Sequence, residues 1–140
     1  PLPRGNDVRR PRWRLDEPRT ALAAVVLSPQ GPLTVVATHL SFLDGWGEHQ
    51  LDHLAAGLAD APRPLVVLGD MNLRSEIPAA VTGWSPLVVA RSYPVAHPTL
   101  QIDHVLADGS VRPTSPGRSV DTGLSDHRAL VVDVEIEPLG

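Results

Sequence analysis

Apolar residues follow two different periods along the first half of the chain. Residues 20–28 (TALAAVVLS) and 33–40 (LTVVATHL) are rich in β-branched and aliphatic side chains, and the turn-forming stretch PQGP separates them. They predict a β-hairpin. Residues 45–60 instead place apolar side chains on one helix face, at positions i, i+3, i+4 and i+7: Leu51, Leu54, Ala55 and Leu58. We expect an amphipathic helix there, ending before the prolines that follow.

The second half of the chain predicts further strands. Residues 64–70 (PLVVLGD) form a short, continuous apolar run, which is typical of a strand buried on both faces. Residues 99–108 (TLQIDHVLAD) predict another strand, and residues 127–137 (HRALVVDVEIE) predict one that closes the sheet.

The intervening segments are less regular. Residues 75–98 predict a short helix capped by Ser75 with Pro78 near its start, followed by SPLVVARSY as a strand or an irregular segment. Residues 109–123 contain the proline breaks of short edge strands. The order of elements predicts an α/β or α+β domain with a mixed β-sheet that has helices on one face.

Composition narrows the class of protein. A chain of 140 residues with 42% hydrophobic and 20% charged residues suits one globular domain. The absence of cysteine excludes a disulfide scaffold, a thiolate metal site and a cysteine nucleophile. No apolar run approaches the ~18 residues of a membrane span. We expect a soluble protein, either cytoplasmic or secreted with any signal upstream of this chain.

The formal net charge of −4 is distributed unevenly. Residues 1–18 are rich in arginine and proline and predict an irregular leader, whereas residues 19–137 predict the folded domain. The leader arginines are either a solvated arm or contacts for nucleic-acid phosphates. The acidic remainder of the chain is compatible with cation binding.

Polar side chains capable of acid, base or metal chemistry interrupt or end several of the apolar strands: His39, Asp70, Asn72, Asp103, Asp126 and His127. A single Asp after a strand is most often a turn former, but four separate strands share this feature. Carboxylate and amide oxygens suit Mg²⁺, Mn²⁺ or Ca²⁺, and histidine beside carboxylate supplies proton transfer. This combination predicts hydrolysis of a phosphate ester.

Four short motifs in order, THL, GDMN, IDHV and SDHRAL, resemble the C-terminal half of the endonuclease/exonuclease/phosphatase superfamily. This superfamily of metal-dependent phosphoesterases includes deoxyribonuclease I, abasic-site endonucleases, inositol polyphosphate phosphatases and neutral sphingomyelinases. The resemblance extends from about Arg19 to Val134. It implies one half of the four-layer sandwich of the deoxyribonuclease I-like fold.

The resemblance also implies roles for the motif residues. His39 would contact the scissile phosphate, Asp70 would orient or deprotonate the attacking water, and Asn72 would hold phosphate or metal. Asp103 would hydrogen-bond His127, which would stabilise the transition state or act as general acid.

Asp126 would be a metal ligand alongside Asp70 and Asn72, and the cofactor would be Mg²⁺, or Mn²⁺ or Ca²⁺. The implied mechanism is in-line attack of water without a covalent intermediate. The substrate would be a nucleic acid, a phospholipid head group or a small phosphodiester.

The early Asn and the metal-binding Glu of the family's first half have no counterpart here, because no strand precedes residue 20. Asp16 and Glu17 lie in the leader and are not assigned to that role. A missing N-terminal half is therefore expected as a partner. The alternative is a catalytically incomplete half-domain that acts as a binding or interaction module.

Other conspicuous side chains have simpler interpretations. His49 and His53 have a zinc-compatible i, i+4 spacing but lie off the apolar helix face and should be exposed. His104 should pack on the strand face opposite Asp103. Ser125 lies directly beside Asp126 and His127, too close in sequence for a catalytic triad, and is expected to be a turn residue.

Overall fold

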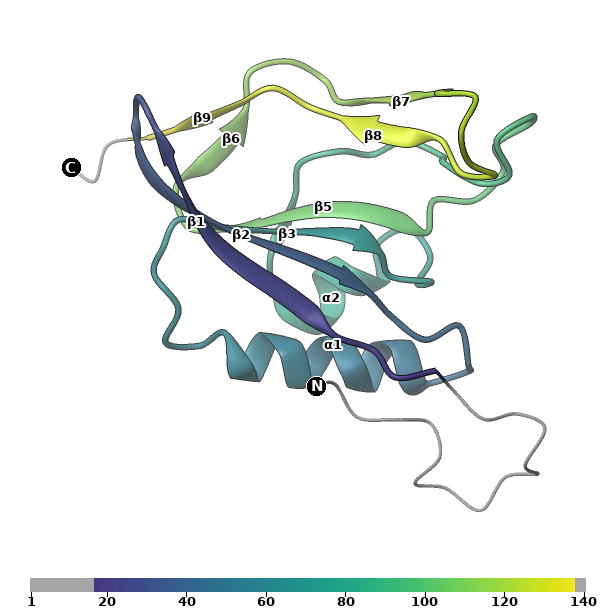
Figure 1. Cartoon of the computed structure of the whole chain (residues 1–140), viewed down its shortest axis with the longest axis horizontal. Coiled ribbons are helices and arrows are strands. Elements are labelled where there is room, and N and C mark those ends of the chain that lie inside the picture. Colours follow the sequence, from purple (N-terminus) through teal and green to yellow (C-terminus); the bar gives the residue numbers. More distant parts are fainter. Residues whose placement is uncertain (1–16, 138–140) are drawn as a thin grey trace.

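The computed structural model of the chain describes residues 17–137, and the leader predicted over residues 1–18 falls almost entirely outside them. A central five-stranded sheet with the order β1-β2-β3-β5-β4 lies between two helices on one face and short C-terminal strands on the other (Figure 1). The prediction of a mixed sheet with helices on one face is confirmed.

The sheet begins with the predicted hairpin. Strands β1 (Ala21–Ser28) and β2 (Gly31–His39) pair in antiparallel fashion along their whole length. The Ser28 hydroxyl closes the turn by donating to the carbonyl of Gly31. Helix α1 (Trp46–Gly57) then returns the chain so that β3 (Leu65–Asp70) lies parallel to β2, a connection that requires a crossover.

Two further strands complete the sheet. Strand β5 (Asp103–Asp108) pairs with β3 in antiparallel fashion, and the two-residue β4 (Ser85–Pro86) pairs with the outer side of β5. The predicted strand over residues 99–108 is thus shorter than expected, because residues 99–102 form a loop that contacts Tyr93 through an isolated bridge at Leu100.

The main core lies between the sheet and the helices. Leu51, Leu54 and Leu58 of the α1 region are buried against the sheet, as the helical periodicity predicted. The sheet contributes alternate residues from the same face, as strand geometry requires: Val36, Leu65, Val67 and Leu106.

The short helix predicted near Pro78 is α2 (Ile77–Thr82), but Ser75 is not its cap. Glu76 occupies the N-cap position without a side-chain hydrogen bond. Ser75 has a positive φ of 46° and donates its backbone N–H to the carbonyl of Gln101. Of the stretch SPLVVARSY, Ser85–Pro86 is strand and residues 87–92 are irregular.

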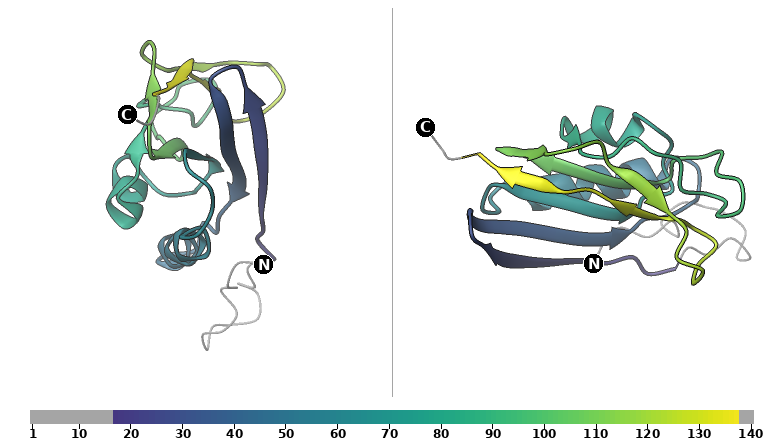
Figure 2. Two further views of the ribbon diagram at one scale, coloured as in Figure 1. Left: turned by 90° about the vertical axis from the view of Figure 1, so that its left-hand side faces the viewer. Right: turned by 90° about the horizontal axis from the view of Figure 1, so that it is seen from above.

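The prediction that residues 127–137 form one strand of the main sheet is wrong. They form β8 (Ala129–Val131) and β9 (Val134–Ile136), which pair with β7 (Arg118–Val120) and β6 (Val111–Pro113) respectively. One outer edge of the main sheet belongs to β1 and the other to β4. The C-terminal segment instead crosses above the sheet (Figure 2). Its Val132 and Val134 pack against a second apolar cluster, formed by Val66, Leu87, Ala107 and Val111.

The hairpin exposes a large amount of apolar surface. Leu22 is 74% exposed, Leu27 is 85% exposed, and Val25 and Val26 are about half exposed. Exposed apolar patches of this kind mark interaction surfaces. Within residues 17–137, no helix has the length and apolar character needed to cross a membrane.

Gly69, in the GDMN motif, occupies a position that only glycine fits, because of its backbone angle and because the neighbouring strand lies too close for a side chain. Its φ is +143°, and a Cβ atom there would lie 1.9 Å from the carbonyl oxygen of Thr38 on the neighbouring strand. We expect Gly69→Ala to lower the free energy of unfolding by about 2 kcal/mol or more, measured as a lower urea midpoint. Gly57→Ala is the matched control, because Gly57 ends α1 with open space around it. Equal midpoints for Gly69→Ala and the parent chain would contradict this interpretation.

Candidate active site

Three of the predicted site residues lie side by side at one edge of the sheet. The strand register pairs His39 with Asp70 and Asp70 with Asp103. Paired positions on neighbouring strands point to the same face, so these side chains form a row across β2, β3 and β5. The sequence placed His39 and Asp70 at strand ends, and the parallel pairing of β2 with β3 brings those ends together. Asp103 was expected inside the strand over residues 99–108, but it is the first residue of β5.

His127 completes the cluster from the segment above the sheet. Its Nδ1 lies 2.8 Å from Oδ2 of Asp103. The same carboxylate oxygen accepts a hydrogen bond of 2.5 Å from the hydroxyl of Ser92, and the ring of Tyr93 packs against the imidazole with centroids 4.8 Å apart. Asp103 and its neighbours therefore fix the orientation of the His127 ring.

The backbone around His127 is anchored to the same loop. Arg128 donates its N–H to the carbonyl of Ser92, and Val95 donates its N–H to the carbonyl of Asp126. Sequence reasoning missed Ser92 and Tyr93, since neither lies in a motif and both reach the site only through this long-range contact.

The two oxygens of Asp70 have different surroundings. Oδ1 accepts the backbone N–H of Asn72 at 2.9 Å, which closes a local turn of the kind Asp favours. Oδ2 lies 3.4 Å from Nε2 of His39 and 4.0 Å from Nε2 of His127. Oδ2 thus faces the space between the two histidines, where a water molecule or a cation could be held.

Asn72 is held with its amide nitrogen turned toward the protein. It has a φ of 52°, a conformation that asparagine tolerates better than most residues. Its Nδ2 donates to the carbonyl of Leu40 at 3.0 Å and lies 3.3 Å from Nε2 of His39. This leaves the amide oxygen as the group that can bind a ligand.

The electrostatics of the cluster follow from partial burial and mutual charge. Burial raises the pKa of Asp70, and the negative charge of Asp103 raises it further, against the hydrogen bond from Asn72 and the two histidines. Burial lowers the pKa of His127, but the hydrogen bond and charge of Asp103, with Asp70 and Asp126, outweigh it and raise the pKa overall. A bound cation would offset the repulsion between the two carboxylates.

The donor set fits a divalent cation. Asp70, Asp103 and His127 each offer one ligand atom, these atoms all lie within 4.8 Å of one another, and all three residues are partly buried. Two carboxylates with an amide oxygen nearby suit a hard cation such as Mg²⁺. Asp126, the predicted metal ligand, lies outside this group of three and is exposed.

His104 is buried, as predicted, and it supports the site from the other face of β5. Its Nε2 lies 2.7 Å from the carbonyl of Leu73, so this nitrogen must donate. Burial lowers the pKa of His104, although the bond to Leu73 opposes that effect. Gln101, which sequence reasoning missed, is buried beside it and donates to the carbonyl of Val88.

His49, His53 and Ser125 behave as expected from the sequence. His49, His53 and His97 are exposed. The hydroxyl of Ser125 accepts the backbone N–H of His127 at 3.1 Å, a local turn contact that confirms its assignment as a turn residue.

The raised pKa of His127 gives a direct prediction. In metal-free protein kept in EDTA, we expect the imidazole to titrate above the ordinary value of 6.5. Asp103→Asn should move this titration to lower pH, because the variant loses the negative charge that stabilises the imidazolium. The measurement is NMR of the ring protons, with exposed His53 as internal control. An unchanged titration of His127 in Asp103→Asn would contradict the assigned contact.

The fold of residues 17–137 is similar to that of several solved structures. An endonuclease/exonuclease/phosphatase from Beutenbergia cavernae DSM 12333 is 24% identical with a TM-score of 0.67, over 87% of this chain and 40% of that chain. D. rerio TDP2, solved with a single-strand DNA product, is 19% identical with a TM-score of 0.61, over 84% and 62%. A mutant beta toxin of Staphylococcus aureus with bound magnesium ions is 9% identical with a TM-score of 0.62, over 83% and 58%.

A model of the Endonuclease/Exonuclease/phosphatase family matches residues 2–127. The chain therefore belongs to this family, as the four sequence motifs predicted. No curated protein matches the sequence. The chain spans about half the length of the solved structures that it resembles.

Proposed function

We propose that this chain provides the C-terminal part of a divalent-metal-dependent enzyme that hydrolyses a phosphate ester by in-line attack of water. The observation that carries the proposal is the position of His127, 2.8 Å from Asp103 and 4.0 Å from the open oxygen of Asp70. A histidine fixed by one carboxylate and facing a second is suited to proton transfer during attack at phosphorus.

Each residue of the row has a role in this proposal. Oδ2 of Asp70 accepts a hydrogen bond from the attacking water and aligns it for attack. His39, whose side chain is 59% exposed, contacts the scissile phosphate from the open side. His127, held by Asp103, donates a hydrogen bond or a proton to the oxygen on which negative charge develops.

The metal ligands in this proposal are Asp70, Asn72 and Asp126. Asp103 and His127, whose possible ligand atoms also lie within 4.8 Å of Asp70, instead hold each other and serve proton transfer. Asp70 and Asn72 present an oxygen each beside the row, and Asp126 lies close enough for its charge to affect His127. The cofactor is Mg²⁺, or Mn²⁺ or Ca²⁺, which when bound would neutralise charge on the phosphoryl oxygens. The magnesium ions in the structurally similar beta toxin support this choice.

We also propose that a further N-terminal segment completes the fold. The apolar hairpin surface supports this partner, as does a cavity of about 330 Å³ between the sheet and the C-terminal strands that only aliphatic side chains line. Domains rarely leave such surface open to water. The shares of 40% and 62% that this chain covers of two similar structures agree with a missing segment.

The exposed hairpin gives a stability prediction for the 140-residue chain alone. We expect it to self-associate, or to melt at low temperature, because Leu22 and Leu27 remain in water. Sedimentation and thermal melts over a range of concentrations measure this. The double variant Leu22→Thr with Leu27→Thr should reduce the self-association. A monomer with a cooperative, concentration-independent melt would contradict the prediction.

The test of the enzymatic proposal is hydrolysis of bis-p-nitrophenyl phosphate by the full natural protein in Mg²⁺ or Mn²⁺. We expect release of p-nitrophenol. A folded protein that binds a divalent cation without hydrolysing this ester or an oligonucleotide would instead support a binding module.

A further inference from the structure

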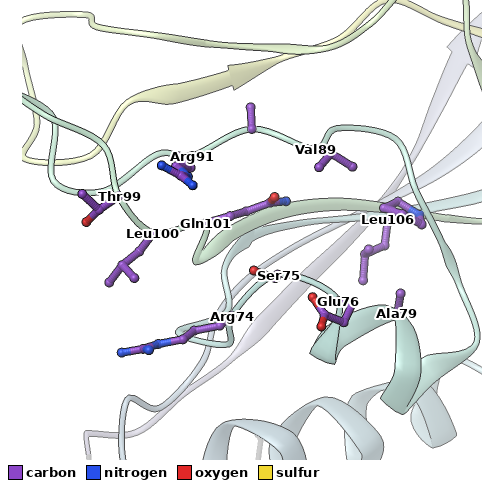
Figure 3. Close-up of a pocket in the computed structure, with 12 residues that line it drawn as sticks. Arg74, Ser75, Glu76, Ala79, Val89, Arg91, Thr99, Leu100, Gln101 and Leu106 are labelled. Atoms are coloured by element: carbon purple, nitrogen blue, oxygen red, sulfur yellow. The ribbon is translucent and has the colours of Figure 1, made fainter.

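A cleft of about 470 Å³ lies beside the candidate active site, between α2, the outer side of β5 and the loop that precedes it (Figure 3). Two arginines, Arg74 and Arg91, line it together with Gln101 and a set of apolar side chains. None of the roles assigned above uses this cleft.

Every segment that lines the polar end of the cleft also bears a residue of the active site. Arg74 follows Asn72 by two positions, Gln101 precedes Asp103 by two, and Arg91 directly precedes Ser92, which hydrogen-bonds Asp103. Consecutive Cα atoms are 3.8 Å apart, so two positions span at most ~7.6 Å. Backbone hydrogen bonds from Met71 to Ile102 and from Ser75 to Gln101 hold the first two segments together.

The charges in the cleft are separated along its length. In Figure 3, Arg74 and Arg91 lie on either side of Gln101 near Thr99 and Leu100, while Glu76 lies at the other end near Ala79. Both arginines are exposed, and within residues 17–137 neither guanidinium has an ion pair or hydrogen bond. The end of the cleft nearest the active site is thus positively charged and open to an anion.

We propose that this cleft binds a second phosphate of the substrate, next to the phosphate that is hydrolysed, and that Arg74 and Arg91 hold it. The inference rests on the proposed function, because it places the first phosphate at the row of His39, Asp70 and Asp103. Guanidinium groups bind phosphate oxygens through paired hydrogen bonds. Apolar side chains further along the cleft, Val89 and Leu106 among them, suit the sugar or base of an adjoining nucleotide.

The substrate class that fits is a single nucleotide strand, whose successive phosphates follow one another along the chain. A small bisphosphate shares the same chemistry at the cleft. The experiment therefore compares a single-stranded oligodeoxynucleotide with a deoxynucleoside 3′,5′-bisphosphate, and uses bis-p-nitrophenyl phosphate as the substrate with one phosphate only.

The test variant is Arg74→Ala with Arg91→Ala in the full natural protein. We expect kcat/KM for the oligonucleotide to fall about tenfold or more, while kcat/KM for bis-p-nitrophenyl phosphate stays within about twofold, because only the second phosphate loses its contacts. If a small ligand is enough to fill the cleft, the bisphosphate should inhibit the parent protein but not the variant. If only the oligonucleotide inhibits the parent protein, the cleft binds a nucleotide strand.

Two control variants each remove one charge, the first away from the cleft and the second within it. Arg112→Ala removes the same charge from β6, at the opposite end of the sheet (Figure 1), and should leave both substrates unaffected. Glu76→Gln removes the negative charge from the cleft and should strengthen oligonucleotide binding. Equal losses for both substrates in the double arginine variant, or no loss for either, would overturn the inference.

A binding measurement keeps the inference testable if the protein hydrolyses neither substrate. The dependence of oligonucleotide affinity on salt concentration reports the number of phosphates contacted, with a slope of about −0.7 per phosphate for single strands. We expect the double arginine variant to lose roughly one such contact. An unchanged slope would refute the cleft assignment, whereas failure to hydrolyse both bis-p-nitrophenyl phosphate and the oligonucleotide refutes the proposed function separately.

Discussion

His127→Ala is expected to reduce hydrolysis of bis-p-nitrophenyl phosphate by roughly 10³-fold, the usual size of the contribution from a positioned acid or base. The variant removes the ring that Asp103 orients at 2.8 Å and that faces Asp70. The side chain is only 23% exposed, so the fold must be checked by its thermal melt. The rate of p-nitrophenol release at saturating metal is the measurement.

His53→Ala is the matched control for this variant. His53 is exposed on α1, and its removal should leave the rate unchanged. A His127→Ala protein that keeps a rate within a few-fold of the parent would remove His127 from the mechanism.

Asp70→Asn is expected to have an effect of similar size, roughly 10³-fold on kcat/KM. The substitution keeps the shape of the side chain and still accepts the N–H of Asn72, so the local turn is preserved. What it loses is the negative charge of Oδ2, which in our proposal aligns the attacking water and helps hold the metal. The change should therefore appear in kcat and in the metal concentration needed for half-maximal rate.

Asp52→Asn makes the same chemical change on the exposed face of α1 and should be silent. If Asp70→Asn needed no more metal than the parent and kept its rate, Asp70 would have neither of its two roles.

The elements governed by local periodicity were predictable from the sequence. The spacing of Leu51, Leu54 and Leu58 defined α1 and its buried face, and the apolar run 64–70 defined β3. The segment 127–137 was wrongly predicted because its alternating apolar residues specify a strand but not its partner. β8 and β9 pair with the three-residue strands β7 and β6 above the sheet, and the sequence of residues 127–137 alone does not specify these partners.

The same distinction between local sequence pattern and tertiary contact applies to the residues of the site. His39 and Asp70 could be placed at strand ends from the sequence, and Asp103 within a strand, but their alignment in one row depends on the register of β2, β3 and β5. Ser92 hydrogen-bonds Asp103 from a loop, and the buried Gln101 donates to the carbonyl of Val88 beside His104. Such supporting residues depend on tertiary contacts, so no motif marks them.

The most direct test of the central claim is the metal dependence of phosphodiester hydrolysis by the full natural protein. The protein is treated with EDTA, assayed with bis-p-nitrophenyl phosphate, and assayed again after addition of excess Mg²⁺ or Mn²⁺. Our account predicts that EDTA abolishes release of p-nitrophenol and that the added cation restores it in the parent and not in His127→Ala. Hydrolysis that persisted in EDTA, or equal restoration in both proteins, would contradict it.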